Sequence, residues 1–320
     1  MNPTAPIGSP ELAEFAGDVR ASLTRQPREL PSKYFYDGLG SALFDAICHL
    51  PWYAVTRAER RLLSGEAGCA VANRYDTFVE LGPGNGSKML TLLSQRCPGA
   101  SPSTIHFVDV SATALQLAAR ALEGVGRSQV VTHETSYEEG FARFARARGP
   151  APALAMFLGS NIGNFAPAAA RRFLRRLRSG LRSGDGFLLG ADLIKSERRL
   201  LDAYDDPLGV TAAFNRNLLV CLQRELEAQI DIEAFEHRAL WNPAECRVEM
   251  HLVSRWDQRV VIPGAGVDFV LAAGETIWTE SSYKYEPDNL RDMLEGSGFE
   301  DATPWIDEAD RFALVHAIVP

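Results

Sequence analysis

Three glycines stand at every second position in residues 78–90, FVELGPGNGSKML, directly after an acidic side chain. The glycines are Gly82, Gly84 and Gly86, and the acidic residue is Glu80. Glycine has no Cβ atom, so such a turn lets a ligand or another part of the chain approach the backbone closely. An apolar run precedes the turn and a helical pattern follows it. Ligands of open α/β sheets bind at this kind of junction, outside the carboxyl end of a strand.

The spacing of the glycines argues against two phosphate-binding motifs. The dinucleotide motif G-x-G-x-x-G needs a glycine where this chain has Ser87, and the G-x-x-x-x-G-K-[ST] loop is absent. The G-x-G-x-G form after an acid resembles instead the S-adenosylmethionine loop of the large methyltransferase class. The methionine end of that cofactor carries a carboxylate, which suits the amides of the turn and of the following helix start. Lys88 is expected to add a charge-assisted contact.

A second acidic residue supports a nucleoside ligand. Asp109 ends the apolar segment HFVD, so in a doubly wound sheet it lies beside the ribose and can accept bonds from both hydroxyls. The alternative is that Asp109 caps the next helix, but Ser111 suits that position better. We expect adenine near residues 133–140, HETSYEEG, with Ser136 and Tyr137 as its contacts.

The segment FLGSNIGNF, residues 157–165, predicts where the chemistry takes place. Gly159 and Gly163 indicate an unusual backbone path at the end of a fourth strand, where functional residues concentrate. The side-chain carbonyl of Asn164 can accept a hydrogen bond from a substrate amine. Methylation of an amine is an in-line displacement at the sulfonium methyl group, and positioning supplies much of its rate.

Five segments in order resemble the histidine Nα-methyltransferase family of ergothioneine biosynthesis. They are KYFYDGLGSALFDAICHLPWYAVTRAE, ELGPGNGSKM, FLGSNIGNF, AYDDPLGVTAAFNRNLL and TESSYKY. The resemblance runs from about residue 30 to the C-terminus. It implies transfer of three methyl groups from S-adenosylmethionine to the α-amine of L-histidine, which gives the betaine hercynine. It also implies a methyltransferase core with a family-specific substrate domain.

The resemblance assigns roles to particular side chains. Asn164 would hold the α-amine and the carboxylate, Tyr204 the carboxylate, and Tyr36 would lie near the amine. Asn164 and Tyr36 are therefore the expected catalytic residues. The remaining assignments concern the imidazole: Tyr53 lies near it, Glu280 and Ser282 bind its edge, and Met250 packs beside the ring.

The chemistry of the acceptor agrees with these assignments, because a carboxylate and a hydroxyl satisfy the two nitrogens of an imidazole. For each residue the alternative is an ordinary packing role. The chain departs from the family at Ala54 and Val55, where members often carry Tyr and Pro, and at Asn161, where Ser or Thr is common. A second hypothesis is therefore the same chemistry on another aromatic amino acid such as tryptophan. A cofactor-binding sensor without catalysis and a nucleotide-dependent oxidoreductase are further alternatives.

The elements that position these residues are visible as alternating strand and helix patterns from residue 77 to 195. We expect strands at residues 77–82, 104–111, 129–134, 153–160 and 186–193, with helices at 87–95, 112–124 and 167–181. Such alternation predicts an α/β fold with a doubly wound, Rossmann-like methyltransferase core. Residues 196–285 break the pattern and predict an inserted mixed α+β substrate-binding domain. We assign residues 1–60 and 196–285 to that domain, and 61–195 and 286–320 to the S-adenosylmethionine-binding core.

Composition limits the partners of the chain. It has 320 residues, 46% of them hydrophobic, and a net charge of −8, which disfavours nucleic-acid binding. No apolar stretch approaches the ~20 residues of a membrane span. The five cysteines are scattered without a CxxC pair, and the six histidines form no HExxH, so neither disulfides nor a metal site is expected. The sequence thus predicts a cytoplasmic, monomeric enzyme with a small-molecule substrate, L-histidine.

Overall fold

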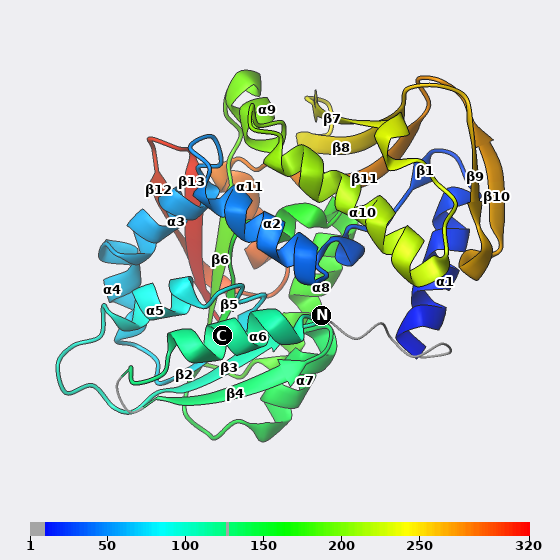
Figure 1. Ribbon diagram of the computed structural model, residues 1–320. Coiled ribbons are helices and arrows are strands. Elements are labelled where there is room, and N and C mark those ends of the chain that lie inside the picture. The colour runs from blue at the N-terminus through cyan, green and yellow to red at the C-terminus, as the bar shows by residue number, and fades with distance from the viewer. Residues whose placement is uncertain (1–9, 126–127) are drawn as a thin grey trace. The chain divides into compact units, whose positions relative to one another are not determined.

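The computed structural model describes residues 10–125 and 128–320, and the chain divides into two compact units. The first unit comprises the described residues up to Tyr53 and the segment Ser196–Ser282. The second unit comprises Ala54–Lys195 and Tyr283–Pro320. Figure 1 shows the course of the chain through both.

The second unit is built on one sheet, which has seven strands among the described residues, in the order β12-β13-β6-β5-β2-β3-β4. The strands are β2 (Thr77–Leu81), β3 (Thr104–Asp109), β4 (Gln129–Glu134), β5 (Ala153–Phe157), β6 (Gly186–Asp192), β12 (Glu300–Asp307) and β13 (Phe312–Ile318). Strands β2 to β6 run parallel, and β13 pairs antiparallel with both β6 and β12. Every residue of β5 and β6 is buried, as expected for parallel strands covered on both faces.

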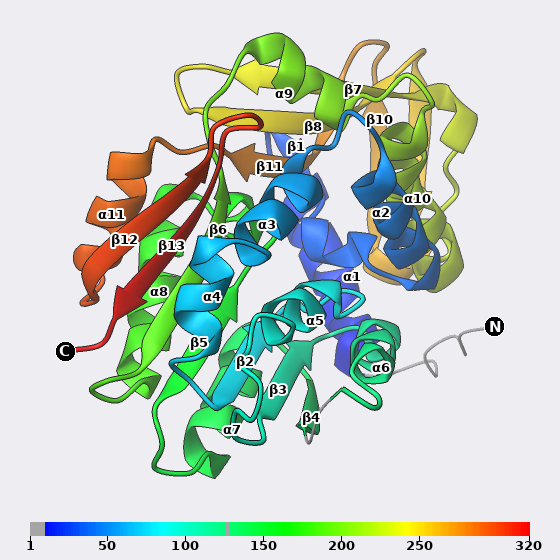
Figure 2. The ribbon, with the colours of Figure 1, turned by 90° about the vertical axis from the view of Figure 1, so that its left-hand side faces the viewer.

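Helices cover both faces of this sheet (Figure 2). One face carries α3 (Val55–Leu63), α4 (Glu66–Ala72), α5 (Ser87–Leu93) and α6 (Ala112–Ala121). The other face carries α7 (Tyr137–Ala147), α8 (Pro167–Gly180) and α11 (Pro287–Glu295). The expected doubly wound α/β core is thereby confirmed. Helix α7, which we did not expect from the sequence pattern, begins where we expected adenine contacts.

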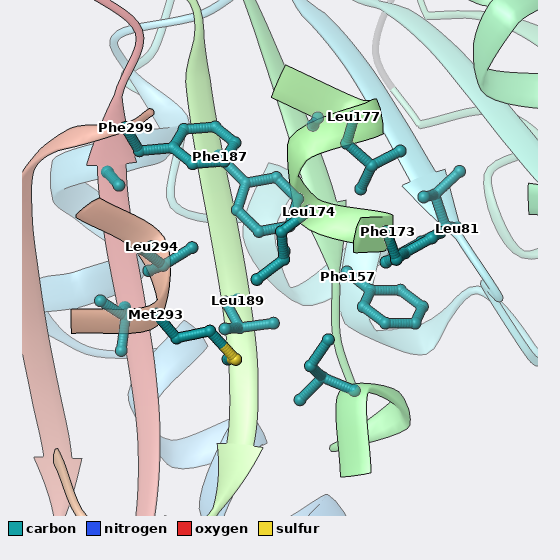
Figure 3. Packing of buried hydrophobic residues seen from close by; sticks show 14 of the residues in the cluster. Leu81, Phe157, Phe173, Leu174, Leu177, Phe187, Leu189, Met293, Leu294 and Phe299 are labelled. Carbon is teal, nitrogen blue, oxygen red and sulfur yellow. The ribbon is translucent and has the colours of Figure 1, made fainter. Parts of the chain in front are cut away.

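The core under α7, α8 and α11 is apolar and rich in phenylalanine. Figure 3 shows side chains of β5, β6, α8 and α11 packed against one another on one face of the sheet. Phe157 packs at 5.0 Å from Phe173, and Phe187 stacks on Phe299 at 5.1 Å between ring centroids. Phe157 is the last residue of β5, so this core packs against the carboxyl end of a central strand, next to the segment on which the candidate site is built.

The first unit is a mixed α+β structure, in agreement with the sequence. Its main sheet has the order β1-β11-β8-β7, with β9 and β10 forming a separate pair. The strands are β1 (Arg28–Glu29), β7 (Phe235–Asn242), β8 (Arg247–Ser254), β9 (Gln258–Ile262), β10 (Val267–Leu271) and β11 (Thr276–Tyr283). The helices are α1 (Pro10–Leu23), α2 (Gly38–His49), α9 (Glu197–Tyr204) and α10 (Val210–Leu226). Helix α10 packs on α2 and on one face of β7 and β8.

Two boundaries differ from the sequence-based division, because residues 54–60 and 283–285 lie in the second unit. Helix α3 packs against β12, β13, α4 and α5, so residues 54–60 belong to the second unit rather than to the first. The apolar side of this helix, including Val55, Ala58 and Leu63, is buried. A substrate-binding role for the first unit stays a prediction.

Candidate active site

The three glycines of the loop all have left-handed backbone conformations, and they differ in what surrounds them. Gly82, Gly84 and Gly86 have φ values of 73°, 58° and 78°. A Cβ atom on Gly86 would lie 2.7 Å from the Cα of Ala118 in α6, and one on Gly82 would lie 2.9 Å from the hydroxyl of Tyr137. A Cβ atom on Gly84 would meet nothing within 4 Å. Two of the glycines therefore permit packing within the chain, and Gly84 presents bare backbone to open space.

Behind this loop lies a buried cluster of two carboxylates and one ammonium group. Glu80, at the end of β2, is fully buried, and neither of its carboxylate oxygens has a hydrogen-bond partner. Burial raises the pKa of Glu80 to about 8; Lys88 lowers it and Glu59 raises it further. Glu80 is thus a buried acid behind the loop, and its direct contact with a cofactor stays a prediction.

Lys88 has a second neighbour that the sequence pattern did not single out. Its ammonium group lies 3.3 Å from a carboxylate oxygen of Glu59 in α3. The other oxygen of Glu59 accepts a 2.7 Å hydrogen bond from the backbone N–H of Gly159. A carboxylate on the buried side of an amphipathic helix, between Val55, Ala58 and Leu63, was the available signal for this residue.

Asp109 lies at the carboxyl end of β3, next to β2. One of its carboxylate oxygens accepts a 2.9 Å bond from the backbone N–H of Ser111, whose own side chain caps α6 by accepting from Ala114. Ser111 is therefore the helix cap, as the sequence indicated. Burial raises the pKa of Asp109, whereas hydrogen bonds from the Ser111 and Val110 amides lower it.

The two residues expected at adenine have different surroundings. Ser136 is exposed and caps α7 by accepting from the N–H of Glu139 at 3.4 Å. The ring of Tyr137 packs against Phe157 at 5.5 Å, and its hydroxyl lies beneath Gly82. Burial raises the pKa of Tyr137. Tyr137 therefore supports the glycine loop from below, and an adenine contact by either residue stays a prediction.

The segment that carries Asn164 begins with a strained turn. Gly159 and Ser160 both have left-handed φ values, 73° and 60°, and Ser160 is not a glycine. The hydroxyl of Ser160 accepts a 3.0 Å bond from the backbone N–H of Asp192 on β6, and Tyr285 donates to the carbonyl of Ile162 at 3.2 Å. Strain of this kind persists where surrounding structure enforces it, and it concentrates at functional sites. Asn164, partly buried, ends the short helix Asn161–Asn164 that follows.

The first unit gathers the aromatic residues that the resemblance assigned to the substrate. Tyr36 packs edge-on against Phe44 at 5.6 Å, and Phe44 against Tyr53 at 6.3 Å. Tyr53 in turn packs edge-on against Tyr204 at 6.3 Å. Tyr36, Tyr53 and Tyr204 thus belong to one aromatic cluster although about 170 residues separate the first from the last in sequence.

The same cluster continues into β11 through a hydrogen bond. The hydroxyl groups of Tyr204 and Ser282 lie 2.7 Å apart, and both residues are buried. Glu280 lies two residues before Ser282 on the same strand and is partly buried. Met250 is buried on the neighbouring strand β8, where its carbonyl accepts a 3.0 Å bond from the hydroxyl of Thr279. The structure thus joins Tyr204 and Ser282 directly, and it places Glu280 and Met250 on adjacent strands.

The described residues, 10–125 and 128–320, contain no group of three or more His, Cys, Asp or Glu side chains arranged to hold a metal ion. Within those residues no helix combines the length and the apolar character that a membrane crossing requires.

The fold and the loop together define the class of protein. The antiparallel strand β13 inserted between β6 and β12, the left-handed G-x-G-x-G turn after β2 and the carboxylate at the end of β3 are features of an S-adenosylmethionine-dependent methyltransferase. The open space at Gly84 and the ammonium group of Lys88 fit the methionine end of that cofactor, and Asp109 fits its ribose.

Comparison with known proteins gives the family. Residues 15–319 match the family model of the histidine-specific, S-adenosylmethionine-dependent methyltransferases, and the chain belongs to this family. It is 42% identical over 315 residues to the histidine N-alpha-methyltransferase of Mycobacterium tuberculosis, covering 95% of this chain and 96% of that protein. It is 40% identical to the enzyme of the same name from Mycolicibacterium smegmatis, covering 94% of each chain.

A more distant relative carries a different substrate in its name. The 4-dimethylallyltryptophan N-methyltransferase ifgB of Penicillium roqueforti is 24% identical, covering 90% of this chain and 88% of that protein. The family model and the two relatives at 40–42% identity show that S-adenosylmethionine is the cofactor of this chain and that N-methylation is its reaction class.

Proposed function

We propose that the chain methylates the α-amine of free L-histidine three times in succession and releases hercynine. The observation that carries this proposal is the buried hydroxyl pair of Tyr204 and Ser282, beside Tyr53 and on the strand of Glu280. These groups supply a donor for a carboxylate and an acceptor–donor pair for the two nitrogens of an imidazole. The named relatives at 40–42% identity support the same acceptor.

The chemistry of each transfer sets requirements on the residues. The α-ammonium group must first lose a proton, and the nitrogen lone pair then attacks the methyl carbon while the carbon–sulfur bond breaks toward sulfur. S-adenosylhomocysteine leaves, and the sequence repeats until the nitrogen carries three methyl groups and no proton. We assign Asn164 and Tyr36 to holding the amine in line for attack, because alignment supplies much of the rate in such displacements.

We assign the cofactor to the second unit, and the acceptor groups other than Asn164 to the first. Gly84 and Lys88 receive the methionine carboxylate, and Asp109 receives the ribose hydroxyls. Because histidine and S-adenosylmethionine are metabolites of the cytoplasm, we place the reaction there. We further propose that the chain acts as a monomer, without a nucleic-acid or membrane partner.

The decisive experiment measures kcat/KM for histidine, tryptophan and phenylalanine, with mass spectrometry to count the methyl groups transferred. We expect histidine to be preferred over tryptophan by at least about a hundredfold, because an indole has one N–H and no second polar nitrogen, so it cannot match both Glu280 and Ser282. Glu280→Gln should lose most activity on histidine. Glu236→Gln, which changes an exposed carboxylate of the same sheet, is the matched control and should retain it.

Three outcomes separate the hypotheses. A preference for tryptophan, or unchanged histidine turnover in Glu280→Gln, would refute the imidazole assignment and leave the methyltransferase class intact. Cofactor binding without turnover of any of the three amino acids would favour the sensor.

A further inference from the structure

Tyr204 is held at three separate points in the first unit. Its hydroxyl lies 2.7 Å from the hydroxyl of Ser282, and its ring packs edge-on against Tyr53. Its backbone carbonyl, at the C-terminal end of α9, accepts a 2.8 Å hydrogen bond from Nε2 of His237 on β7. The last carbonyls of a helix have no partner within the helix, so an outside donor can fix the position of the residue that carries them.

The protonation of His237 is determined by Asn215 of α10. The Asn215 amide nitrogen donates both to the backbone carbonyl of His251, at 3.1 Å, and to Nδ1 of His237, at 2.8 Å. The carbonyl of His251 can only accept, so it fixes the orientation of the amide. Nδ1 of His237 must then accept, and the single ring proton must sit on Nε2. The Nε2–H group is therefore always available to the carbonyl of Tyr204.

This arrangement has an energetic cost. Asn215 is fully buried, and its side-chain oxygen has no hydrogen-bond partner. A buried polar atom without a partner is unfavourable, and an apolar residue would fill the same space without that penalty. A cost of this kind is understandable if the amide is retained to orient His237.

The neutral state of the His237 ring is favoured mainly by burial, and the charged groups around it act in both directions. Burial lowers its pKa, whereas the Tyr204 carbonyl and Asp205 raise it. Asp205, on the turn after α9, is exposed and lies 3.9 Å from Nε2. Arg216 of α10 lowers the pKa further, and Asp206 raises it. Asp206 is itself occupied by the backbone N–H groups of Leu208, Val210 and Thr211.

We propose that Asn215 and His237 are positioning residues that set the hydroxyl of Tyr204 for the carboxylate of the amino-acid substrate. The inference rests on the proposed function, because it takes the role of Tyr204 from there. The two residues act through Tyr204 and do not touch the substrate themselves. Loss of either residue weakens binding of the acceptor amino acid and leaves binding of the cofactor unchanged.

The first test replaces His237 and measures two equilibria by calorimetry. In His237→Phe we expect the Kd of histidine, measured with S-adenosylhomocysteine bound, to rise about tenfold, as for loss of one buried hydrogen bond. The Kd of S-adenosylhomocysteine should stay within about twofold of the wild-type value. His237→Gln keeps a side-chain N–H donor and should restore most of the histidine affinity.

The matched control is His316→Phe in the second unit. His316 is a buried histidine on β13 whose Nε2 lies 3.0 Å from the hydroxyl of Tyr75. This variant should lose stability without a change in the Kd of histidine. Equal effects of His237→Phe on both ligands, or no recovery in His237→Gln, would overturn the proposal.

The second test uses the proton on Nε2. Asn215→Asp replaces a donor with an acceptor, so Nδ1 must carry the proton and a neutral His237 turns a lone pair toward the carbonyl of Tyr204. Only the doubly protonated ring restores that bond. The ratio of the histidine Kd in Asn215→Asp to the wild-type Kd should therefore increase as the pH rises from 6 to 9. A constant ratio would overturn the proposal.

Tyr204→Phe separates the role of Tyr204 in binding the substrate from the positioning role of Asn215 and His237. If this variant binds histidine as tightly as the wild type, the role of Tyr204 is wrong, and the positioning proposal fails with it. If Tyr204→Phe binds histidine weakly and His237→Phe binds it normally, only the positioning proposal fails.

Discussion

The three loop glycines have different surroundings. We therefore predict that alanine substitutions at Gly84 and at Gly86 will differ in their effects on stability and on ligand binding. Gly84→Ala and Gly86→Ala each place a side chain at a left-handed φ, 58° and 78° respectively. That conformation costs an L-residue about 1–2 kcal/mol. Gly84→Ala has no further energetic cost from packing, because the new Cβ atom meets nothing within 4 Å.

Gly86→Ala adds a collision between backbones. The new Cβ atom would lie 2.7 Å from the Cα and 2.9 Å from the carbonyl oxygen of Ala118. Carbon atoms in contact normally stay about 3.5–4.0 Å apart, so α5 or α6 must shift by nearly 1 Å. Overpacking of this kind costs about 1–3 kcal/mol beyond the conformational term. Gly86→Ala should therefore be destabilised by about 2–5 kcal/mol, well beyond Gly84→Ala.

For ligand binding we expect the reverse order, with the larger effect at Gly84. If Gly84 faces the methionine end of the cofactor, Gly84→Ala should weaken S-adenosylhomocysteine binding at least tenfold despite its small effect on stability. Gly99→Ala is the control, since Gly99 is also exposed and has a φ of 85°, and a Cβ atom added there would meet nothing within 4 Å. It should lose as much stability as Gly84→Ala and bind the ligand normally.

Thermal unfolding of the ligand-free protein and calorimetric titration of the four proteins supply the measurements. Equal unfolding midpoints for Gly84→Ala and Gly86→Ala would refute the packing argument. Wild-type affinity in Gly84→Ala would refute the assignment of that glycine to the cofactor.

Three further predictions concern the second unit. Asn164→Ala should lower turnover by an order of magnitude or more with little change in cofactor affinity, because misplacement near the reacting atom is costly; near-normal turnover would move the acceptor site elsewhere. Arg148→Met should cost about 3–5 kcal/mol in urea unfolding, because it leaves the buried Asp185, bound at 2.6 and 2.8 Å, without its counter-ion. The exposed ion pair of Arg143 and Glu139 is the control, and Arg143→Met should change little. Glu80, with its pKa raised to about 8, contributes stability that is present below its unfolded pKa of 4.5 and is lost as the pH rises to about 8. Glu80→Gln cannot ionise, so its unfolding midpoint relative to the wild type should increase from pH 5 to pH 8, and parallel curves would contradict the burial argument.

Much of the fold follows from local patterns in the sequence. The alternation of apolar runs and helical patterns predicts the strands β2 to β6. The same patterns place Asp109 and the Asn164 segment at strand ends, and parallel strands bring those ends to one edge of a sheet. Helix α7 is an element that the alternation did not predict, although its buried side carries Gly140, Phe141 and Phe144 at helical spacing.

The residues that the sequence determined by itself are those whose role depends on type and spacing along the chain, such as Gly82, Gly84, Gly86 and Ser111. Only the tertiary structure decided that Gly86 is required by α6, that Glu59 pairs with Lys88, and that His237 holds the carbonyl of Tyr204. Glu59 and Gly159 are 100 residues apart, and His237 and Tyr204 are 33 apart on different elements. Backbone periodicity is a local property and reports which side of an element is buried. Which partner a buried polar group meets depends on how the elements pack, and that is settled only when distant segments come together.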